Sequence, residues 1–251
     1  SRNVAVGYNS LKALNYDGNG YNVAIGFDAG KAVSTGVQNT LIGGHAGDAL
    51  TTGTENVAIG YAALSAEDGY GQNVAVGNYA LHQLNASGNA LNTAIGYFAG
   101  YALTTGTNNT IVGGLAGSAL IDGSSNVLIG KDAGDSLTAG SRNVAIGTDA
   151  LQSENGHGRN VAIGYEALLT QDADTDAYNV AVGYQAGVSV TTGALNTLIG
   201  GLAGDALTEG NSNVAIGSNA LSSEVLGDRS VAVGNNALLS QSNASDTDVY
   251  N

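Results

Sequence analysis

The sequence predicts an all-β protein folded as a parallel β-solenoid, in which each turn of backbone stacks on the next. The first observation is the pentad Asn22-Val23-Ala24-Ile25-Gly26, which occurs fourteen times with small changes. It recurs about every seventeen to nineteen residues, and such a fixed period is typical of solenoids, whose units bury their apolar faces only against neighbouring units. The second is the composition, because 39 glycines and no heptad pattern argue against helical repeats. The fourteen units begin at Asn3, Asn22, Asn39, Asn56, Asn73, Asn92, Asn109, Asn126, Asn143, Asn160, Asn179, Asn196, Asn213 and Ser230.

Each pentad is expected to form one short strand. Numbered from the first residue of its unit, position 2 is Val or Thr, position 4 is Ile or Val and position 5 is Gly in all fourteen units. Alternate β-branched residues followed by glycine indicate a strand that ends in a bend. The side chains at positions 2 and 4, such as Val23 and Ile25, are expected to face the inside of the coil.

The second half of each unit is expected to add one large core side chain. Position 8 is Ala in every unit except the first, where it is Ser10. In half of the units a Leu follows at position 9, as at Leu64; in the other half position 9 is Gly and the large aliphatic residue comes at position 12, as at Gly47 and Leu50. A polar, glycine-rich corner leads to the next unit, and extra residues there are expected to be exposed.

Position 3 bears on the number of chains. If positions 2 and 4 face inward, position 3 faces outward, yet it is Ala in ten units and Leu or Ile in the other four, at Leu41, Ile111, Leu128 and Leu198. Strands that are apolar on both faces belong to sheets covered on both sides. A homo-oligomer of parallel solenoids would supply the cover, and a plain exposed alanine face is the alternative.

The repeated asparagines have two interpretations. Aligned side-chain amides could form a ladder from turn to turn, as stacked identical strands do. Asparagine also tolerates the backbone angles of turns. The candidate structural ladder consists of Asn3, Asn22, Asn39, Asn56, Asn73, Asn92, Asn109, Asn126, Asn143, Asn160, Asn179, Asn196 and Asn213.

The charge and composition restrict the partners. Seven basic and 21 acidic residues give a formal net charge of −14, spread without a block. Such a surface repels phosphate backbones, so nucleic acid is not an expected partner. No apolar run approaches the roughly 20 residues of a membrane span, so no membrane insertion is expected within this segment. Without cysteine, disulfides and thiolate metal sites are excluded.

The repeat predicts a single array over residues 1–251. Ser1-Arg2 precedes the first pentad as Ser141-Arg142 precedes another, and Tyr250-Asn251 repeats the start of an internal unit. These matches predict a segment of a longer fibre, or a subunit that continues end to end.

The repeats resemble a known family. Asn-Val-Ala-Ile-Gly at 22–26, 143–147 and 213–217 is similar to the head repeats of trimeric autotransporter adhesins of the YadA type. Asn-Thr-Ala-Ile-Gly-Tyr at 92–97 is similar to 17-residue repeats of bacterial and phage fibre proteins. The resemblance implies a left-handed parallel β-roll, a homotrimer and a surface-exposed stalk or adhesive fibre. The chain departs from the adhesin heads in its longer turns and in having no neck, coiled-coil stalk or membrane anchor in this segment.

Catalytic and metal chemistry has little support in the sequence. His45, His82 and His157 occupy different positions of their units, which argues against a zinc site. No nucleophile stands beside a base and an orienting group, so no enzyme and no catalytic or cofactor-binding residue is expected. The string Asp172, Asp174 and Asp176 is a weak calcium candidate without the Gly and distal Glu of an EF-hand, and a solvated corner is the alternative.

An aromatic column offers a candidate site for sugar contact. Position 6 is aromatic in six units, and exposed aromatic rings can stack on sugar rings or simply pack on one another. The candidates for sugar contact are Tyr8, Phe27, Tyr61, Tyr97, Tyr165 and Tyr184.

The expected function is structural: a non-enzymatic, acidic, rigid repeat region of an extracellular fibre or adhesin at a cell or virion surface, with surface glycans or a host receptor as candidate partners. The alternatives are a subunit of an end-to-end matrix filament, and a carbohydrate-binding module that uses the aromatic column. Ice binding ranks lower, because position 2 is Thr in only four units.

Overall fold

The computed structural model describes residues 2–242 as a parallel β-solenoid of about fourteen turns, with no helix in the described part. The asparagines that begin successive turns are usually 17 residues apart, as for Asn22 and Asn39. In the longer turns they are 19 residues apart, as for Asn3 and Asn22. Ser1 and residues 243–251 lie outside the described residues, and these include Ser1, Tyr250 and Asn251, on which the predicted end-to-end continuation rests. The chain divides into two compact units, residues 1–125 and 126–251.

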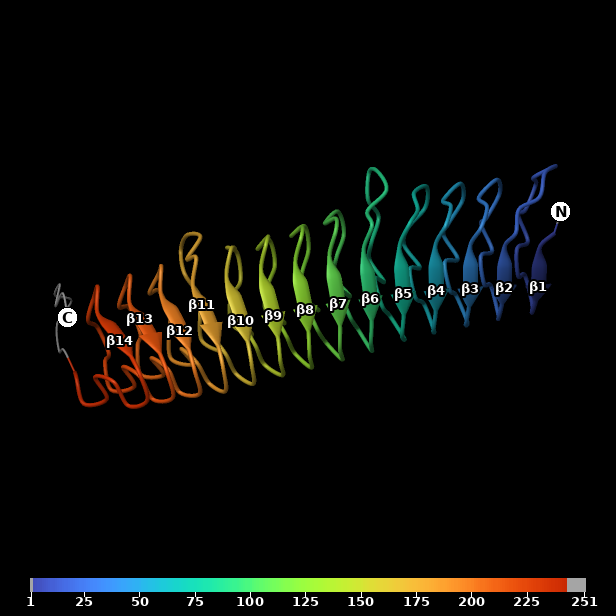
Figure 1. Cartoon of the computed structure of the whole chain (residues 1–251). Coiled ribbons are helices and arrows are strands. Elements are labelled where there is room, and N and C mark those ends of the chain that lie inside the picture. The colour runs from blue at the N-terminus through green and yellow to red at the C-terminus, as the bar shows by residue number, and fades with distance from the viewer. Residues whose placement is uncertain (1, 243–251) are drawn as a thin grey trace. The chain divides into compact units, whose positions relative to one another are not determined.

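Each unit carries seven three-residue strands, one per turn (Figure 1). In the first unit they are β1 (Val4–Val6), β2 (Val23–Ile25), β3 (Thr40–Ile42), β4 (Val57–Ile59), β5 (Val74–Val76), β6 (Thr93–Ile95) and β7 (Thr110–Val112). In the second they are β8 (Val127–Ile129), β9 (Val144–Ile146), β10 (Val161–Ile163), β11 (Val180–Val182), β12 (Thr197–Ile199), β13 (Val214–Ile216) and β14 (Val231–Val233).

Within each unit the strands pair in parallel, in chain order and without a register shift. In β2 and β3, for example, Ala24 lies beside Leu41 and Ile25 beside Ile42. Hydrogen bonds between turns continue beyond the strands, since Asp28 N donates to Tyr8 O at 2.9 Å. The predicted fold class is therefore confirmed, whereas the left-handed coil stays a prediction.

The predicted orientation of the strand side chains is wrong. Ala24 and Leu41, at position 3, are fully buried, whereas Ile25, at position 4, is 38% exposed. Position 3 is buried in every strand from β2 to β14, and positions 2 and 4 are partly or fully exposed. The physical reason is the two-residue period of a strand: position 1 is a buried asparagine, so position 3 points inward with it.

The core combines small and large side chains in complementary places. Leu64 at position 9 and Leu50 at position 12 are both fully buried, as predicted for the two kinds of turn. A Leu or Ile at position 3 occurs only in turns with Gly at position 9. A Cβ atom added to Gly47 would lie 2.8 Å from Leu41 Cδ2, so the glycine leaves room for the leucine.

The bends use backbone angles that L-residues rarely adopt. Position 5 is glycine with φ between 125° and 143°, and non-glycine residues with φ near 50° to 60° recur at position 7, as at Asp28, and at position 9, as at Leu64. These left-handed residues turn the chain sharply without helix. The hydrogen bonds between turns hold them in place.

One buried feature was not expected from the sequence. In several turns with Leu at position 9, position 12 is a fully buried polar residue, as at Glu67, Glu154, Gln171 and Glu224. Glu67 Oε1 accepts a hydrogen bond from Tyr70 N at 3.0 Å, and its Oε2 accepts one from Ala86 N at 3.3 Å. The carboxylate therefore ties a corner loop to the next turn.

Candidate ligand-binding surface

The thirteen asparagines occupy position 1, immediately before their strands, and form a hydrogen-bonded column inside each unit. Asn22 Oδ1 accepts a hydrogen bond from Asn39 N at 2.9 Å, and the same bond joins every neighbouring pair within each unit. In all ten of the shorter turns, Nδ2 also donates to the backbone carbonyl fourteen residues ahead, as from Asn22 to Gly36 O at 2.8 Å. The column thus connects side-chain amides to the backbone of the corner.

The longer turns, which begin at Asn3, Asn73 and Asn160, lack that bond to the corner carbonyl. Asn3 Nδ2 and Asn160 Nδ2 are buried without a hydrogen-bond partner, and Asn73 Nδ2 instead donates to Gly71 O at 3.2 Å. Two extra residues shift the corner carbonyl away from the amide. The longer corners therefore weaken the internal hydrogen bonding of their turns.

The aromatic candidates in the first unit become part of a larger series. Tyr8 stacks on Phe27, with 5.5 Å between ring centroids, but the next ring is His45, which lies edge-on to Phe27 at 5.3 Å. His45 then contacts Tyr61 at 5.8 Å, and Tyr61 contacts Tyr79 at 5.4 Å. His45 and Tyr79 both lie at position 7. His45 connects the rings of Phe27 and Tyr61, which lie at position 6, and Tyr79 extends the row beyond Tyr61.

The far end of the series is a cluster of rings. Phe98 contacts Tyr97, Tyr79 and Tyr101, and His82 stacks on Tyr101 with 5.3 Å between centroids. In the second unit Tyr165 stacks on Tyr184 at 5.5 Å. The sequence did not predict the ring contacts of Tyr79, Phe98, His82 and Tyr101, because each position was compared only with the same position of other turns, whereas these contacts join positions 7 and 10.

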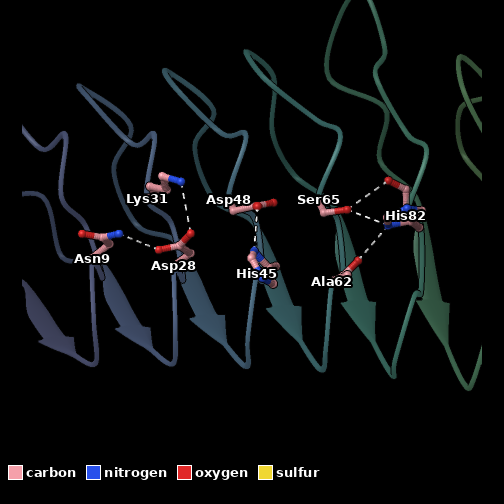
Figure 2. Close-up of polar contacts among 8 residues, drawn as sticks. All are labelled: Asn9, Asp28, Lys31, His45, Asp48, Ala62, Ser65 and His82. Atoms are coloured by element: carbon pink, nitrogen blue, oxygen red, sulfur yellow. Dashed lines mark hydrogen bonds and ion pairs between the residues drawn. The ribbon is translucent and has the colours of Figure 1, made fainter.

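Polar residues form two rows along successive turns in the first unit (Figure 2). Position 7 carries Asn9, Asp28 and His45, and position 10 carries Lys31, Asp48, Ser65 and His82; Ala62, also at position 7, contributes only its backbone carbonyl. A hydrogen bond of 2.6 Å joins Ser65 Oγ and His82 Nδ1, and one of 3.1 Å joins His45 Nδ1 and Asp48 Oδ2.

The contacts of the Ser65 and His82 pair differ from those of a Ser-His-Asp relay. His82 Nδ1 lies 3.3 Å from Ala62 O as well as 2.6 Å from Ser65 Oγ, so one ring nitrogen makes both contacts. In a Ser-His-Asp relay the serine and the acid contact opposite nitrogens of the ring. The geometry favours a rigid polar wall over a nucleophile.

Two shallow hollows lie over these rows. The aromatic hollow, of about 480 Å³, is lined by His45, Asp48, Tyr61, Ser65, Tyr79 and His82 above the alanines at 62 and 66. The lysine hollow, of about 560 Å³, is lined by Lys12, Lys31, Asp48 and Ser65 above the alanines at 13, 32 and 49. Both include Asp48 and Ser65, so the two hollows adjoin along the stacked turns.

The electrostatics of the two rows follow from local pairing. The hydrogen bond that Asn9 Nδ2 donates to Asp28 at 2.9 Å, helped by Lys31 at 3.1 Å, lowers the pKa of the Asp28 carboxyl. Burial among neighbouring rings raises the pKa of the Tyr79 hydroxyl above its usual value. Asp28 is therefore a stable anion paired with Lys31, and Tyr79 is a neutral hydrogen-bonding group.

The aspartates at 172, 174 and 176 do not gather around one point. Asp172 and Asp174 are exposed, while Asp176 pairs with Arg159 and accepts a hydrogen bond from Gly158 N at 3.0 Å. Between residues 2 and 242 no group of three or more His, Asp or Glu side chains is arranged to hold a metal ion.

His157 also differs from the other histidines in its surroundings. It lies at a corner, where its backbone N donates to the buried Glu154 at 3.0 Å, whereas His45 and His82 both line the aromatic hollow. His45 and His82 therefore line one surface, although they occupy different positions of their turns.

Comparison with protein-family models, with curated proteins and with solved structures found no match for this chain. Over the described residues, no helix has the length and apolar character of a membrane span.

Proposed function

We propose that this chain is a non-enzymatic structural segment of an extracellular fibre, and that it associates with copies of itself through the outer face of its sheet. The outer face consists of the side chains at positions 2 and 4. The resemblance to adhesin head repeats and to fibre repeats supports a homotrimer, surface display and an extracellular location. The observation that carries the proposal is the chemistry of the outer face.

The outer face is apolar and shaped alike in every turn. Position 2 is Val or Thr and position 4 is Ile or Val, so the face carries no charged residue at either position. Several of its side chains are well exposed, among them Ile95 at 42% and Ile216 at 37%. A parallel sheet with apolar side chains on both faces is typical of sheets that are covered on both sides.

The repeat itself favours a second copy as the cover. The two columns of side chains recur once per turn, a spacing of about 4.8 Å set by the backbone hydrogen bonds. Another copy has the same spacing, so its side chains can interdigitate over consecutive turns, as identical columns do in steric zippers. β-branched side chains have few rotamers, which keeps the entropy cost of this packing small.

The interior supports a mechanical role. Backbone hydrogen bonds, the asparagine column and fully buried leucines connect each turn to its neighbours within a unit. Stability in such arrays is roughly a sum over turns and their contacts, so each inner turn is held by both of its neighbours. A segment built this way transmits load and holds its surface in a fixed arrangement.

The proposal is tested by measuring the mass of the full chain in solution. Light scattering is expected to give a discrete mass of three chains, and the outer-face variants Ile95→Lys and Ile216→Lys are expected to shift it toward one. Leu195→Lys is the matched control, because Leu195 is 59% exposed but lies at position 17, on the corner. The proposal is contradicted by a monomer at all concentrations, or by an assembly that persists in both Ile95→Lys and Ile216→Lys. Open-ended growth in mass would support the end-to-end filament instead of the trimer.

A further inference from the structure

We propose that the aromatic hollow in the first unit binds a neutral saccharide, whose ring packs on Tyr61 while its hydroxyl groups bond to the residues at position 10. This site is separate from the outer face of the sheet, and the inference does not depend on self-association. It differs from the column at position 6, because its polar partners come from position 10 and its second ring from position 7.

The hollow offers an apolar platform in a fixed orientation. Tyr61 is 47% exposed, and its ring is held edge-on between His45 at 5.8 Å and Tyr79 at 5.4 Å. The C–H face of a pyranose ring packs on an aromatic face of this kind. Because the neighbouring rings already restrain Tyr61, binding costs little side-chain entropy.

The polar side of the hollow, called here the polar wall, consists of the residues at position 10 and lies beside the rings of Tyr61 and Tyr79. Asp48, Ser65 and His82 come from three consecutive turns and present a carboxylate, a hydroxyl and an imidazole along one line (Figure 2). Consecutive turns place these groups about 4.8 Å apart, so neighbouring hydroxyls of one sugar can reach two of them. A concave site with an apolar base and a few fixed polar groups is the usual form of a small-ligand site.

The hydrogen bonds within the wall fix its groups before a ligand arrives. Ser65 Oγ is held by His82 Nδ1 at 2.6 Å, and Asp48 Oδ2 is held by His45 Nδ1 at 3.1 Å. Each of these side chains keeps further hydrogen-bonding capacity, since a carboxylate has two oxygens and a hydroxyl both donates and accepts. Fixed donors and acceptors of both kinds suit hydroxyl groups.

The charges favour a neutral ligand. Asp48 lies in the hollow itself, and the chain carries a formal net charge of −14, so an anionic sugar would be repelled. Lys31, in the adjoining lysine hollow, is already paired with Asp28 at 3.1 Å. The lysine hollow continues the surface over earlier turns, which gives room for an oligosaccharide rather than a single sugar.

The experiment titrates the full chain with neutral cello-, chito-, malto- and manno-oligosaccharides by calorimetry, and with one uronic-acid oligosaccharide for comparison. At least one neutral series is expected to bind saturably, and Tyr61→Ala is expected to weaken it at least about tenfold. Ala66→Gln is expected to do the same by filling the base of the hollow, and Gln83 shows that the next turn accepts glutamine at this position.

Two variants serve as matched controls. Tyr70→Ala removes a ring of similar exposure, 40%, from a corner outside both hollows, and Ala119→Gln makes the same exchange at position 11 of a turn outside the hollow. Both are expected to bind like the unaltered chain. The inference is overturned by no binding of any neutral series, by binding of the uronic-acid series alone, or by Tyr61→Ala and Ala66→Gln variants that both keep the affinity of the unaltered chain. Circular dichroism checks that each variant is folded. If Tyr61→Ala unfolds, the affinity of Ala66→Gln decides the question.

Discussion

Asn39 Nδ2 donates a hydrogen bond of 2.8 Å to Gly53 O, so that one side-chain amide closes a whole turn of the coil. Asn39 Oδ1 also accepts a hydrogen bond from Asn56 N at 3.0 Å, and this bond connects the side chain to the backbone of the next turn. Both partners are backbone groups of a buried column. The amide therefore satisfies one backbone acceptor of its own turn and one donor of the next.

Asn39→Ala is expected to lower the free energy of unfolding by about 2 to 5 kcal/mol, because Gly53 O and Asn56 N lose their partners in the interior. Asn160→Ala is the comparison at the same position of a longer turn, in the second unit. Asn160 Nδ2 already has no partner, and Asn160 Oδ1 accepts only from the next asparagine, Asn179 N, at 3.1 Å. Its loss is expected to cost about 1 to 3 kcal/mol.

Chemical denaturation of both variants measures the difference. Equal costs for Asn39→Ala and Asn160→Ala would show that the bond to the corner carbonyl contributes nothing. A larger cost for Asn160→Ala would contradict the assignment of the weaker hydrogen bonding to the longer turns.

The buried Glu67 is expected to make the protein more stable in mild acid. Burial raises the pKa of the Glu67 carboxyl above its usual value of 4.5, against the opposing effect of the hydrogen bonds from backbone N–H groups, and Glu154 behaves alike. A carboxyl whose folded-state pKa is raised binds more protons when folded. Its stabilisation is present below the unfolded pKa and is lost as the pH rises from 4.5 through the folded value.

Glu67→Gln is expected to flatten this pH dependence, since it removes the proton linkage. Gln171 shows that the amide fits at position 12, where its Nε2 donates to Thr191 O at 2.8 Å. Thermal unfolding between pH 4.5 and 8 provides the measurement. Exposed Glu209→Gln controls for the lost charge; if both variants flatten the curve equally, burial of Glu67 is not the cause.

The period and the strands could be predicted from the sequence, because each turn repeats the same pattern of β-branched residues and glycine. The direction of the side chains could not be taken from hydrophobicity, since positions 2, 3 and 4 are all apolar or, at Thr, nearly so. The asparagine at position 1 held the missing information. The buried asparagine column places position 1 inside, and the two-residue period then places position 3 inside with it.

The candidate surface was only partly predictable, for a different reason. Tyr61 and Phe27 share position 6, so comparing turns finds them, but His45 and Tyr79 belong to position 7 and extend the same row of rings. Contact between different positions of neighbouring turns depends on how each bend directs its side chains. The backbone at position 7 is left-handed, as at Tyr79 with φ near 60°. Residue type did not predict this conformation, because most residues at position 7 are neither glycine nor asparagine, the two residues that favour it.

Leu41 and Gly47 are expected to be coupled in stability. Leu41→Ala alone leaves a cavity in the coil and is expected to cost about 3 to 5 kcal/mol. Gly47→Leu alone overpacks, because a Cβ at 47 would lie 2.8 Å from Leu41 and Leu50, and is expected to cost about 1 to 3 kcal/mol. The double variant recreates the arrangement around Ala75, Leu81 and Leu84.

A double-mutant cycle measures this coupling by denaturation. The double variant is expected to be more stable than the sum of the single effects by at least about 1 kcal/mol. Leu120→Ala with Gly47→Leu is the control, because Leu120 lies four turns away and should add independently. An additive result for the Leu41 and Gly47 pair would show that the two residues do not share one space.

Gly60→Ala is expected to be among the most damaging single substitutions in the first unit. Gly60 has φ of 133°, and an added Cβ would lie 2.5 Å from Gly77 O and 2.6 Å from Gly77 C. Those atoms are backbone of the next turn, so the clash cannot be relieved by a side-chain rotation. Strained angles and displaced turns together are expected to lower the free energy of unfolding by at least about 3 kcal/mol.

Gly114→Ala provides the matched comparison. It follows directly after the equivalent bend of another turn, but nothing lies within 4 Å of an added Cβ and its φ is not in the left-handed region. Alanine there is expected to change the free energy of unfolding by less than about 1 kcal/mol, because it mainly restricts the unfolded chain. If urea denaturation gave Gly60→Ala and Gly114→Ala the same small effect, the close stacking of successive bends would not be needed for the coil to form.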